Sequence, residues 1–160
     1  MDKNMDYITI LIESLDKKIG ALDEIIVLNI KQYESVTKDT IDDDAFNEAI
    51  QEKGECIKVI EEMDEGFDKI YNYVKDEIVA NKEKYKKEIE LLKEKIAEIT
   101  EKSMEVQLGE KRNEQAVMKA LADERKNIKQ SKVSTKVASD YYKSMNKVNY
   151  VAPQFLDKKN

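Results

Sequence analysis

The chain has 160 residues and a net charge of −6, with 39% charged and 41% apolar residues, four glycines, one proline and no tryptophan. This composition is typical of long helices or a coiled coil and does not suit a compact mixed fold. The absence of histidine removes the commonest general base and metal ligand, and the single cysteine, Cys56, excludes an intramolecular disulfide and suits a reducing cytosol.

The first predicted element is a long amphipathic helix over about residues 4–38. Residues recur on one face at steps of three and four, and Asn29 is the only polar one among Met5, Ile8, Ile12, Leu15, Ile19, Leu22, Ile26, Asn29, Tyr33 and Val36. This spacing predicts the a/d seam of a helix that packs lengthwise on a partner helix. The apolar run at 8–12 is too short, and its flanks too acidic, for a signal peptide or a transmembrane span.

The second predicted element is a helix over about residues 43–79. Three aspartates, 42–44, stand at its start and are expected to cap its free amides and to suit the positive end of its dipole. A calcium loop is the alternative, but it would also need a glycine and a distal glutamate that are missing here. Its seam is interrupted only by Lys53, and it comprises Phe46, Ala49, Lys53, Cys56, Ile60, Met63, Phe67, Ile70 and Val74. Cys56 lies on this seam and is expected to be a buried small hydrophobe.

The third predicted element is a longer helix over about residues 81–130, with Asn81 as its expected cap. Its seam is apolar up to Ile99 and mixed afterwards, over Tyr85, Ile89, Leu92, Ile96, Ile99, Ser103, Val106, Glu110, Asn113, Val117, Ala120 and Glu124. A helix of about 50 residues would extend past partners of about 35 residues. We therefore expect an all-α, elongated antiparallel three-helix bundle whose last helix keeps unpartnered apolar side chains: Val117, Leu121 and Ile128.

Residues 131–160 form a basic, aromatic tail that differs from the helical body over residues 1–130. Residues 1–110 carry 16 Lys and Arg against 29 Asp and Glu, whereas residues 111–160 carry 12 against 5. Four of the eleven aromatic residues lie after residue 138, and apolar residues at steps of four and three predict an amphipathic segment: Val133, Val137, Tyr141, Met145 and Val148. Pro153 ends any helix in this segment.

No catalytic group is evident in the sequence, so we expect a protein that is not an enzyme and uses no cofactor. It has no glycine-rich phosphate loop, no metal-spaced Cys and His set and no nucleophile paired with histidine. Four interpretations of the tail can be compared. We expect no nucleic-acid binding, because the chain is acidic overall and has no recognisable binding module, and no membrane insertion, because the apolar stripe of the tail is thin and lacks tryptophan. The tail then either folds back to cap the bundle or joins an exposed helix face in binding a partner helix. The last interpretation gives eight candidate partner-binding residues: Val117, Leu121, Ile128, Val133, Val137, Tyr141, Tyr142 and Met145.

The order of these elements resembles flagellar type III export chaperones of the FlgN type, with the FliT type as a close neighbour. The resemblance covers roughly residues 5–145 and depends on helix lengths and apolar spacing. It is carried by the seam helix from Met5 to Val36, the acidic turn "TIDDD", the second helix with "EKGECIKVIEEMDEGFDKIY", the last helix "KEIELLKEKIAEITEKSMEVQLGEKRNEQAVMKAL" and the tail "ASDYYKSMNKVNYV".

The resemblance implies a cofactor-free cytoplasmic protein that binds the amphipathic terminal helices of flagellar axial proteins. FlgN-type members serve hook–filament junction proteins, and FliT-type members serve the filament cap. Both deliver their cargo to the export gate or its ATPase complex, through contacts of the last helix and of a tail tyrosine that matches Tyr141 or Tyr142. The sequence leaves the cargo and a homodimer open, together with the alternative of a structural coiled-coil adaptor that self-associates through the same seam.

Overall fold

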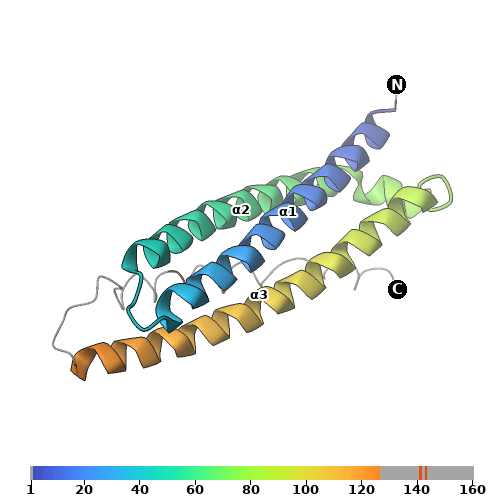
Figure 1. Cartoon of the computed structure of the whole chain (residues 1–160). Helices are drawn as coiled ribbons and strands as arrows, with labels where there is room; N and C mark the ends of the chain where they lie inside the picture. The colour runs from blue at the N-terminus through green and yellow to red at the C-terminus, as the bar shows by residue number, and fades with distance from the viewer. Residues whose placement is uncertain (1, 127–140, 142, 144–160) are drawn as a thin grey trace.

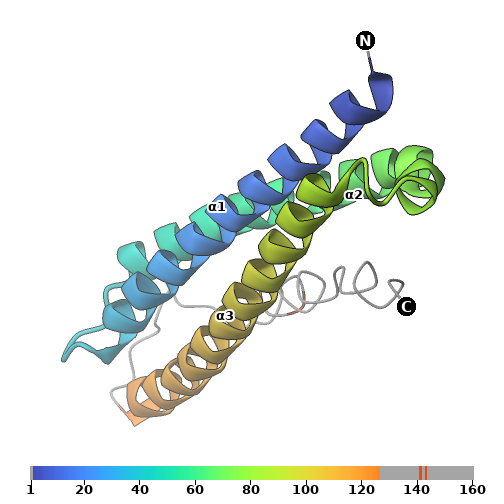
Figure 2. The same cartoon turned by 90° about the vertical axis from the view of Figure 1, so that its right-hand side faces the viewer.

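Three helices make up nearly all of the structure, a computed structural model that describes residues 2–126, 141 and 143. They are α1 (Lys3–Thr37), α2 (Asp43–Ala80) and α3 (Lys86–Lys126). Helix α2 runs back along α1, and α3 then runs in the same direction as α1 (Figure 1; Figure 2). The described residues contain no strand, which confirms the predicted all-α three-helix bundle.

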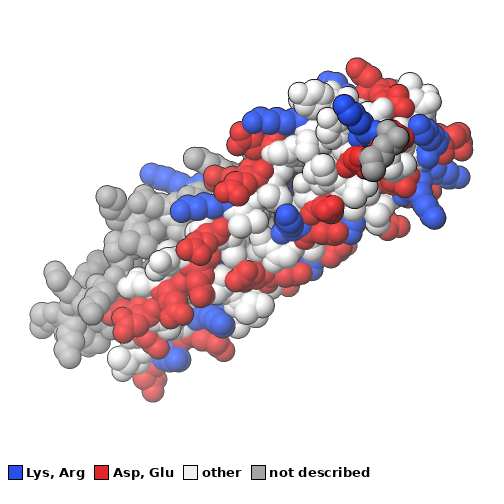
Figure 3. Space-filling view, turned by 90° about the horizontal axis from the view of Figure 1, so that it is seen from above, with Lys and Arg blue, Asp and Glu red and all other residues white. Residues whose placement is uncertain are grey.

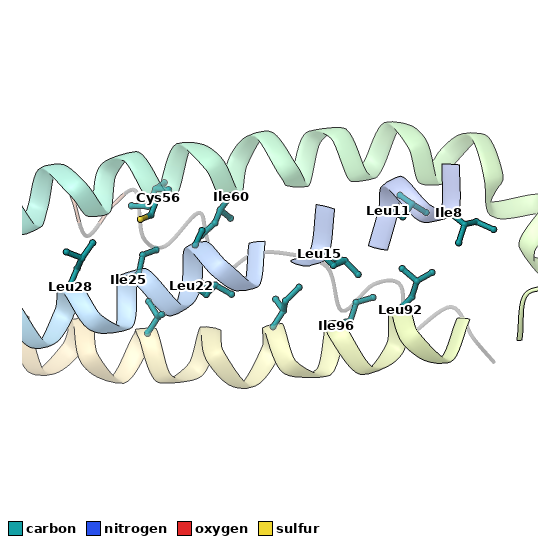
Figure 4. Packing of buried hydrophobic residues seen from close by; sticks show 14 of the residues in the cluster. Ile8, Leu11, Leu15, Leu22, Ile25, Leu28, Cys56, Ile60, Leu92 and Ile96 are labelled. Carbon is teal, nitrogen blue, oxygen red and sulfur yellow. The ribbon is translucent and has the colours of Figure 1, made fainter. Parts of the chain in front are cut away.

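Helix α1 lies in the middle of the bundle. Both α2 and α3 pack along it but make few direct contacts with each other, and Figure 4 shows the side chains of α1 between those of the two outer helices. The face of α1 is therefore buried on two sides, along a heptad pattern that alternates steps of three and four: Ile8, Leu11, Leu15, Lys18, Leu22, Ile25, Asn29, Gln32 and Val36.

This buried face corrects the predicted seam of the first helix. The prediction placed Ile12, Ile19 and Ile26 at its centre, but these residues are only half-buried at one edge. Lys18 and Gln32 are fully buried instead, and their polarity concealed the true pattern. Lys18 reaches Asp64 of α2 at 2.8 Å, so this buried ammonium has a partner carboxylate.

Aspartates begin the first two helices, as predicted for the second. The Asp2 carboxylate accepts from the Asn4 amide at 3.0 Å, and that of Asp42 accepts from the Ala45 amide at 3.0 Å. The Asp42 amide also donates to the Ser35 carbonyl at 2.8 Å, which closes the connection between α1 and α2. The acidic turn therefore acts as a helix cap that satisfies free amides.

Helix α3 begins five residues later than predicted, because Asn81 ends α2 instead of capping α3. The backbone amide of Asn81 donates to the Glu77 carbonyl at 3.0 Å, and its side-chain amide donates to the same carbonyl at 3.2 Å. A turn follows, and Tyr85 anchors it by burying its ring and donating its hydroxyl hydrogen to Glu77 at 2.9 Å.

The expectation of an unpartnered last helix is wrong for the described part of α3. Helix α3 has 41 residues, close to the 35 of α1 and the 38 of α2, and its predicted end near residue 130 lies outside the described residues. Val117 and Ala120 are buried against Val36 and Phe46, next to the connection between α1 and α2. Val117 and Ala120 thus belong to the core.

Two apolar clusters form this core. The larger one follows most of the bundle, includes Cys56 as the predicted buried hydrophobe, and draws on all three helices (Figure 4). The smaller one contains Val36, Phe46, Val117 and Ala120. No described helix carries an apolar stretch long enough to cross a lipid bilayer.

Two glycine substitutions are expected to change stability in opposite directions. Gly54→Ala should raise the free energy of unfolding by about 1 kcal/mol, because the new methyl group meets no atom within 4 Å and alanine favours the helix. Gly109→Ala should lower it, because its Cβ would lie 2.8 Å from Nδ2 of buried Asn29. Urea denaturation of both variants checks this, and a stabilising Gly109→Ala would contradict the described contact between α1 and α3.

Candidate functional site

A layer of polar side chains crosses the core between the two apolar clusters. All three helices and the tail contribute to this buried polar layer, and each of its members is at most 5% exposed: Asn29, Gln32, Lys53, Glu110, Asn113 and Tyr141. Buried polar groups lose hydration, so each must find a partner inside the protein. The layer is therefore a set of specific contacts within an otherwise apolar bundle.

Lys53 of α2 lies at the centre of the layer and is fully buried. Its Nζ donates to Asn29 Oδ1 at 2.8 Å and lies 3.1 Å from each carboxylate oxygen of Glu110, and it also donates to Gln32 Oε1. One ammonium group thus links α2 to both α1 and α3. These contacts supply an acceptor for every hydrogen of the ammonium group.

Tyr141 is the described tail residue that completes the layer. Its ring lies over Lys53, with the Nζ atom 3.7 Å from the ring centroid, and its hydroxyl donates to Glu110 Oε2. Both Tyr141 and Lys143 have helical backbone, and Tyr141 is 5% exposed while Lys143 is exposed. The ring therefore joins α2 and α3, which otherwise contact each other little.

The two asparagines of the layer bring α1 and α3 close together. Asn113 Nδ2 donates to the Asn29 carbonyl at 3.1 Å, and Asn29 Nδ2 donates to the Val106 carbonyl at 3.5 Å. Within the described part of the chain, Gln32 Nε2 and Asn113 Oδ1 make no hydrogen bond. Nearly all hydrogen-bonding groups of the layer therefore have a partner. These contacts fix the axial register of the helices relative to one another.

Burial changes the ionisation of the central pair. Desolvation lowers the pKa of Lys53 from 10.5 to about 8, although the attraction of Glu110 acts against this shift. Desolvation likewise raises the pKa of Glu110 from 4.5 to about 7, against the attraction of Lys53. Such values resemble those of an acid–base pair, but the two groups face each other and neither lines the hollow described next. A structural role therefore suits the pair better than proton transfer to a substrate.

A hollow of about 250 Å³ lies between α1 and α3 on the outside of the layer. Its lining combines apolar side chains with one acidic and one basic group: Ile26, Asn29, Ile30, Glu105, Leu108, Gly109 and Arg112. Leu108 is 72% exposed and Ile30 is 49% exposed. This feature, called the α1–α3 hollow below, combines open volume with exposed apolar side chains.

The predicted partner-binding residues do not form one exposed surface among those that the structure describes. Val117 is 3% exposed in the smaller cluster, Leu121 is half-buried against it, and Tyr141 is buried in the polar layer. The placement of Tyr141 is the one that the capping interpretation predicted for the tail. The other five candidates lie outside the described residues: Ile128, Val133, Val137, Tyr142 and Met145.

The sequence interpretation missed the polar layer, although it noted some of its members as exceptions in the seams. Asn29, Lys53, Glu110 and Asn113 all stood at seam positions. Pairing Lys53, the one basic exception, with an acidic exception of the third seam would have left a choice between Glu110 and Glu124. Gln32 gave no such signal, because it lay beside the predicted seam.

Charges of both signs are mixed on the face of the molecule that Figure 3 shows, where Lys and Arg side chains lie among Asp and Glu side chains. In the described residues, no three Cys, Asp or Glu side chains converge in a way that could hold a metal ion. No protein-family model, curated protein or solved structure matches the chain.

Proposed function

We propose that the chain is a cytoplasmic export chaperone of the FlgN type that binds the amphipathic terminal helices of flagellar axial proteins. The observation that carries this proposal is the position of Tyr141 between Lys53 of α2 and Glu110 of α3. The outer helices pack on α1 and contact each other little, so a helical residue from another segment of the chain fits between them. A bundle that accepts a helical aromatic residue in this way suits the helix-in-groove mode of binding.

The contacts around Tyr141 also suit reversible binding. An aromatic ring over an ammonium group and one hydroxyl donated to a carboxylate are separate, modest interactions, and the cation–π contact contributes about 0.5–2 kcal/mol. Cargo delivery requires an affinity in the micromolar to nanomolar range, about −8 to −12 kcal/mol, so that the cargo is held and then released. In the proposed cycle the cargo is a hook–filament junction or filament cap protein, and the recipient is the export gate or its ATPase complex.

Co-expression with candidate junction and cap proteins, followed by affinity capture of the full-length chain, tests this proposal. We expect one class of axial protein to be captured. Deleting the terminal helices of that axial protein should abolish its capture. Failure of the full-length chain to bind any junction or cap protein would contradict the proposal. A structural adaptor that self-associates through its seam is less well supported, because the described seams are already buried within one chain.

The tail tyrosines provide the sharper variant of the test. Tyr141→Ala with Tyr142→Ala is expected to reduce capture of cargo or gate by at least about ten-fold, since an aromatic anchor in an interface contributes about 2 kcal/mol or more. The buried position of Tyr141 means that the variant should also melt earlier. Tyr142→Ala alone separates the effect of the second substitution from that of losing the buried Tyr141 ring. If the double variant has a lower melting temperature yet binds cargo and gate normally, Tyr141 contributes to stability and not to partner binding.

A further inference from the structure

Along the outer edge of the α1–α3 contact, ion pairs between the two helices give way to the α1–α3 hollow. Two ion pairs, one heptad apart on each helix, close the first part of this edge: Lys95 with Asp16 and Lys102 with Asp23. One further heptad along both helices, the corresponding positions are Ile30 and Gly109. The edge therefore opens into the α1–α3 hollow where the third ion pair would stand.

The close approach of Asn29 requires the glycine in this hollow. A Cβ atom at position 109 would lie 2.8 Å from Asn29 Nδ2, so no larger residue fits there without a shift of the polar layer. Immediately beside this gap, Leu108 projects with 72% of its surface exposed. On this face of α3, the exposed side chain of Leu108 therefore lies directly beside the α1–α3 hollow.

The charges on this face of α3 have a specific order. At steps of seven, the helix carries two acidic residues and then two basic residues, all of them exposed: Glu98, Glu105, Arg112 and Lys119. The change of sign falls between Leu108 and Gly109. Arg112 lies 5.0 Å from the ring centroid of Tyr33 and makes no ion pair with a described residue, so its charge is available to a partner.

We propose that this face binds a second copy of the chain, with the two α3 helices antiparallel about a two-fold axis between Leu108 and Gly109. That symmetry places Glu105 opposite Arg112 of the second copy and Leu108 opposite the second copy's hollow. It also places Glu98 opposite Lys119 of the second copy. Each contact occurs twice, as an isologous interface requires.

The order of charges selects this partner and this orientation. A parallel pair of α3 helices would place Glu105 against Glu105 and Arg112 against Arg112, which costs free energy. An acidic half followed by a basic half is complementary to itself only when it is reversed. The proposed surface is the outer flank of α1 and α3, and the inference is independent of any cargo or export function.

Sedimentation velocity of the full-length chain from about 1 µM to about 200 µM tests the proposal. We expect a reversible dimer with a dissociation constant of about 10–100 µM, at the weak end for specific contacts, that weakens as salt is raised. Leu108→Ala should weaken it, whereas Met118→Ala, which is equally conservative and also on an exposed part of α3, should not. A chain that stays monomeric at the highest concentration overturns the proposal and leaves the hollow to a different protein.

Charge reversal tests the symmetry itself. Glu105→Arg and Arg112→Glu, each alone, place like charges at both copies of the contact and should weaken the dimer by at least about ten-fold. An equimolar mixture of the two variants should dimerise again, because each contact then joins opposite charges. Circular dichroism confirms that both variants remain folded. The antiparallel arrangement is overturned if the single reversals leave the dissociation constant unchanged. It is also overturned if the equimolar mixture does not dimerise as tightly as the wild type.

Discussion

Leu15→Asp is expected to unfold the bundle at ordinary temperature. Leu15 is buried in the larger apolar cluster, where α1 meets both outer helices. A carboxylate at this position would lose its hydration without a partner and would also leave a cavity, at a cost of several kcal/mol. A domain of this kind has a total stability of about 5–15 kcal/mol, so most of the folded population should disappear. Thermal melting followed by circular dichroism measures the loss.

Two matched variants on the same helix make this test specific to burial. Ile19→Asp should cost less than Leu15→Asp, because Ile19 is only half-buried at the edge of the seam. Ile10→Asp should cost least of the three, because Ile10 is 43% exposed. Equal melting temperatures for all three variants would show that α1 is not packed between two helices.

Glu110→Ala is expected to destabilise the protein by about 3–5 kcal/mol, because Lys53 would remain buried without its carboxylate partner. Tyr141 would also lose the acceptor of its hydroxyl. Replacing both charged groups, with Lys53→Met and Glu110→Leu together, should recover only part of the loss. Buried ion pairs are often replaceable by apolar pairs, but Gln32 Oε1 and the Tyr141 hydroxyl would then lose their partners. Urea denaturation of Lys53→Met, Glu110→Leu and the double variant, together with the wild type, forms a double-mutant cycle. A neutral Glu110→Ala variant would contradict the described layer.

The same pair should give stability a characteristic dependence on pH. The pKa of Glu110 is raised to about 7 in the folded protein, so its contribution is present below its ordinary pKa of 4.5 and is lost as the pH rises through 7. The pKa of Lys53 is lowered to about 8, so its contribution is present above 10.5 and is lost as the pH falls through 8. The pair therefore contributes least between about pH 7 and 8.

Comparison with Glu110→Gln isolates this effect from the many surface carboxylates. The free energy of unfolding of the wild type, minus that of Glu110→Gln, should fall between pH 5 and pH 7, because Glu110 ionises in the unfolded wild type over this range while it stays protonated in the folded protein. A pKa shift of one unit corresponds to about 1.4 kcal/mol, which is measurable by urea denaturation at each pH. A difference that stays constant over this range would show that Glu110 titrates normally.

The sequence predicted the helices well because their apolar spacing and capping residues are local signals. The starts and ends of α1 and α2 fall within one residue of the expected positions. The predicted face of α1 was displaced toward Ile12, Ile19 and Ile26, because a central helix has a wide buried face and its other side contains Lys18 and Gln32. Hydrophobic spacing alone cannot identify a buried lysine whose partner lies on another helix.

The polar layer was predictable only in part. The short connection between α1 and α2 fixes their register, and Asn29 and Lys53 are equally far from Ile41, so their contact follows from counting. The axial register of α3 against α1 depends on the turn that ends at Tyr85, and the sequence did not predict this turn. Tyr141 lies too far along the sequence from Lys126 for its register to follow from counting, so the expected partner-binding tyrosine could not be assigned to the core beforehand.

The central place of α1 also determines the order in which its surface is covered during synthesis. The α1–α2 contacts are close in sequence near their connection, whereas the ion pairs between α1 and α3 join residues 79 positions apart. At about 5–20 residues per second, the ribosome needs about 2–8 seconds to make the 41 residues of α3 after α2 is complete. A nascent α1–α2 hairpin therefore carries an open apolar stripe for seconds, and aggregation during translation is most probable in this interval.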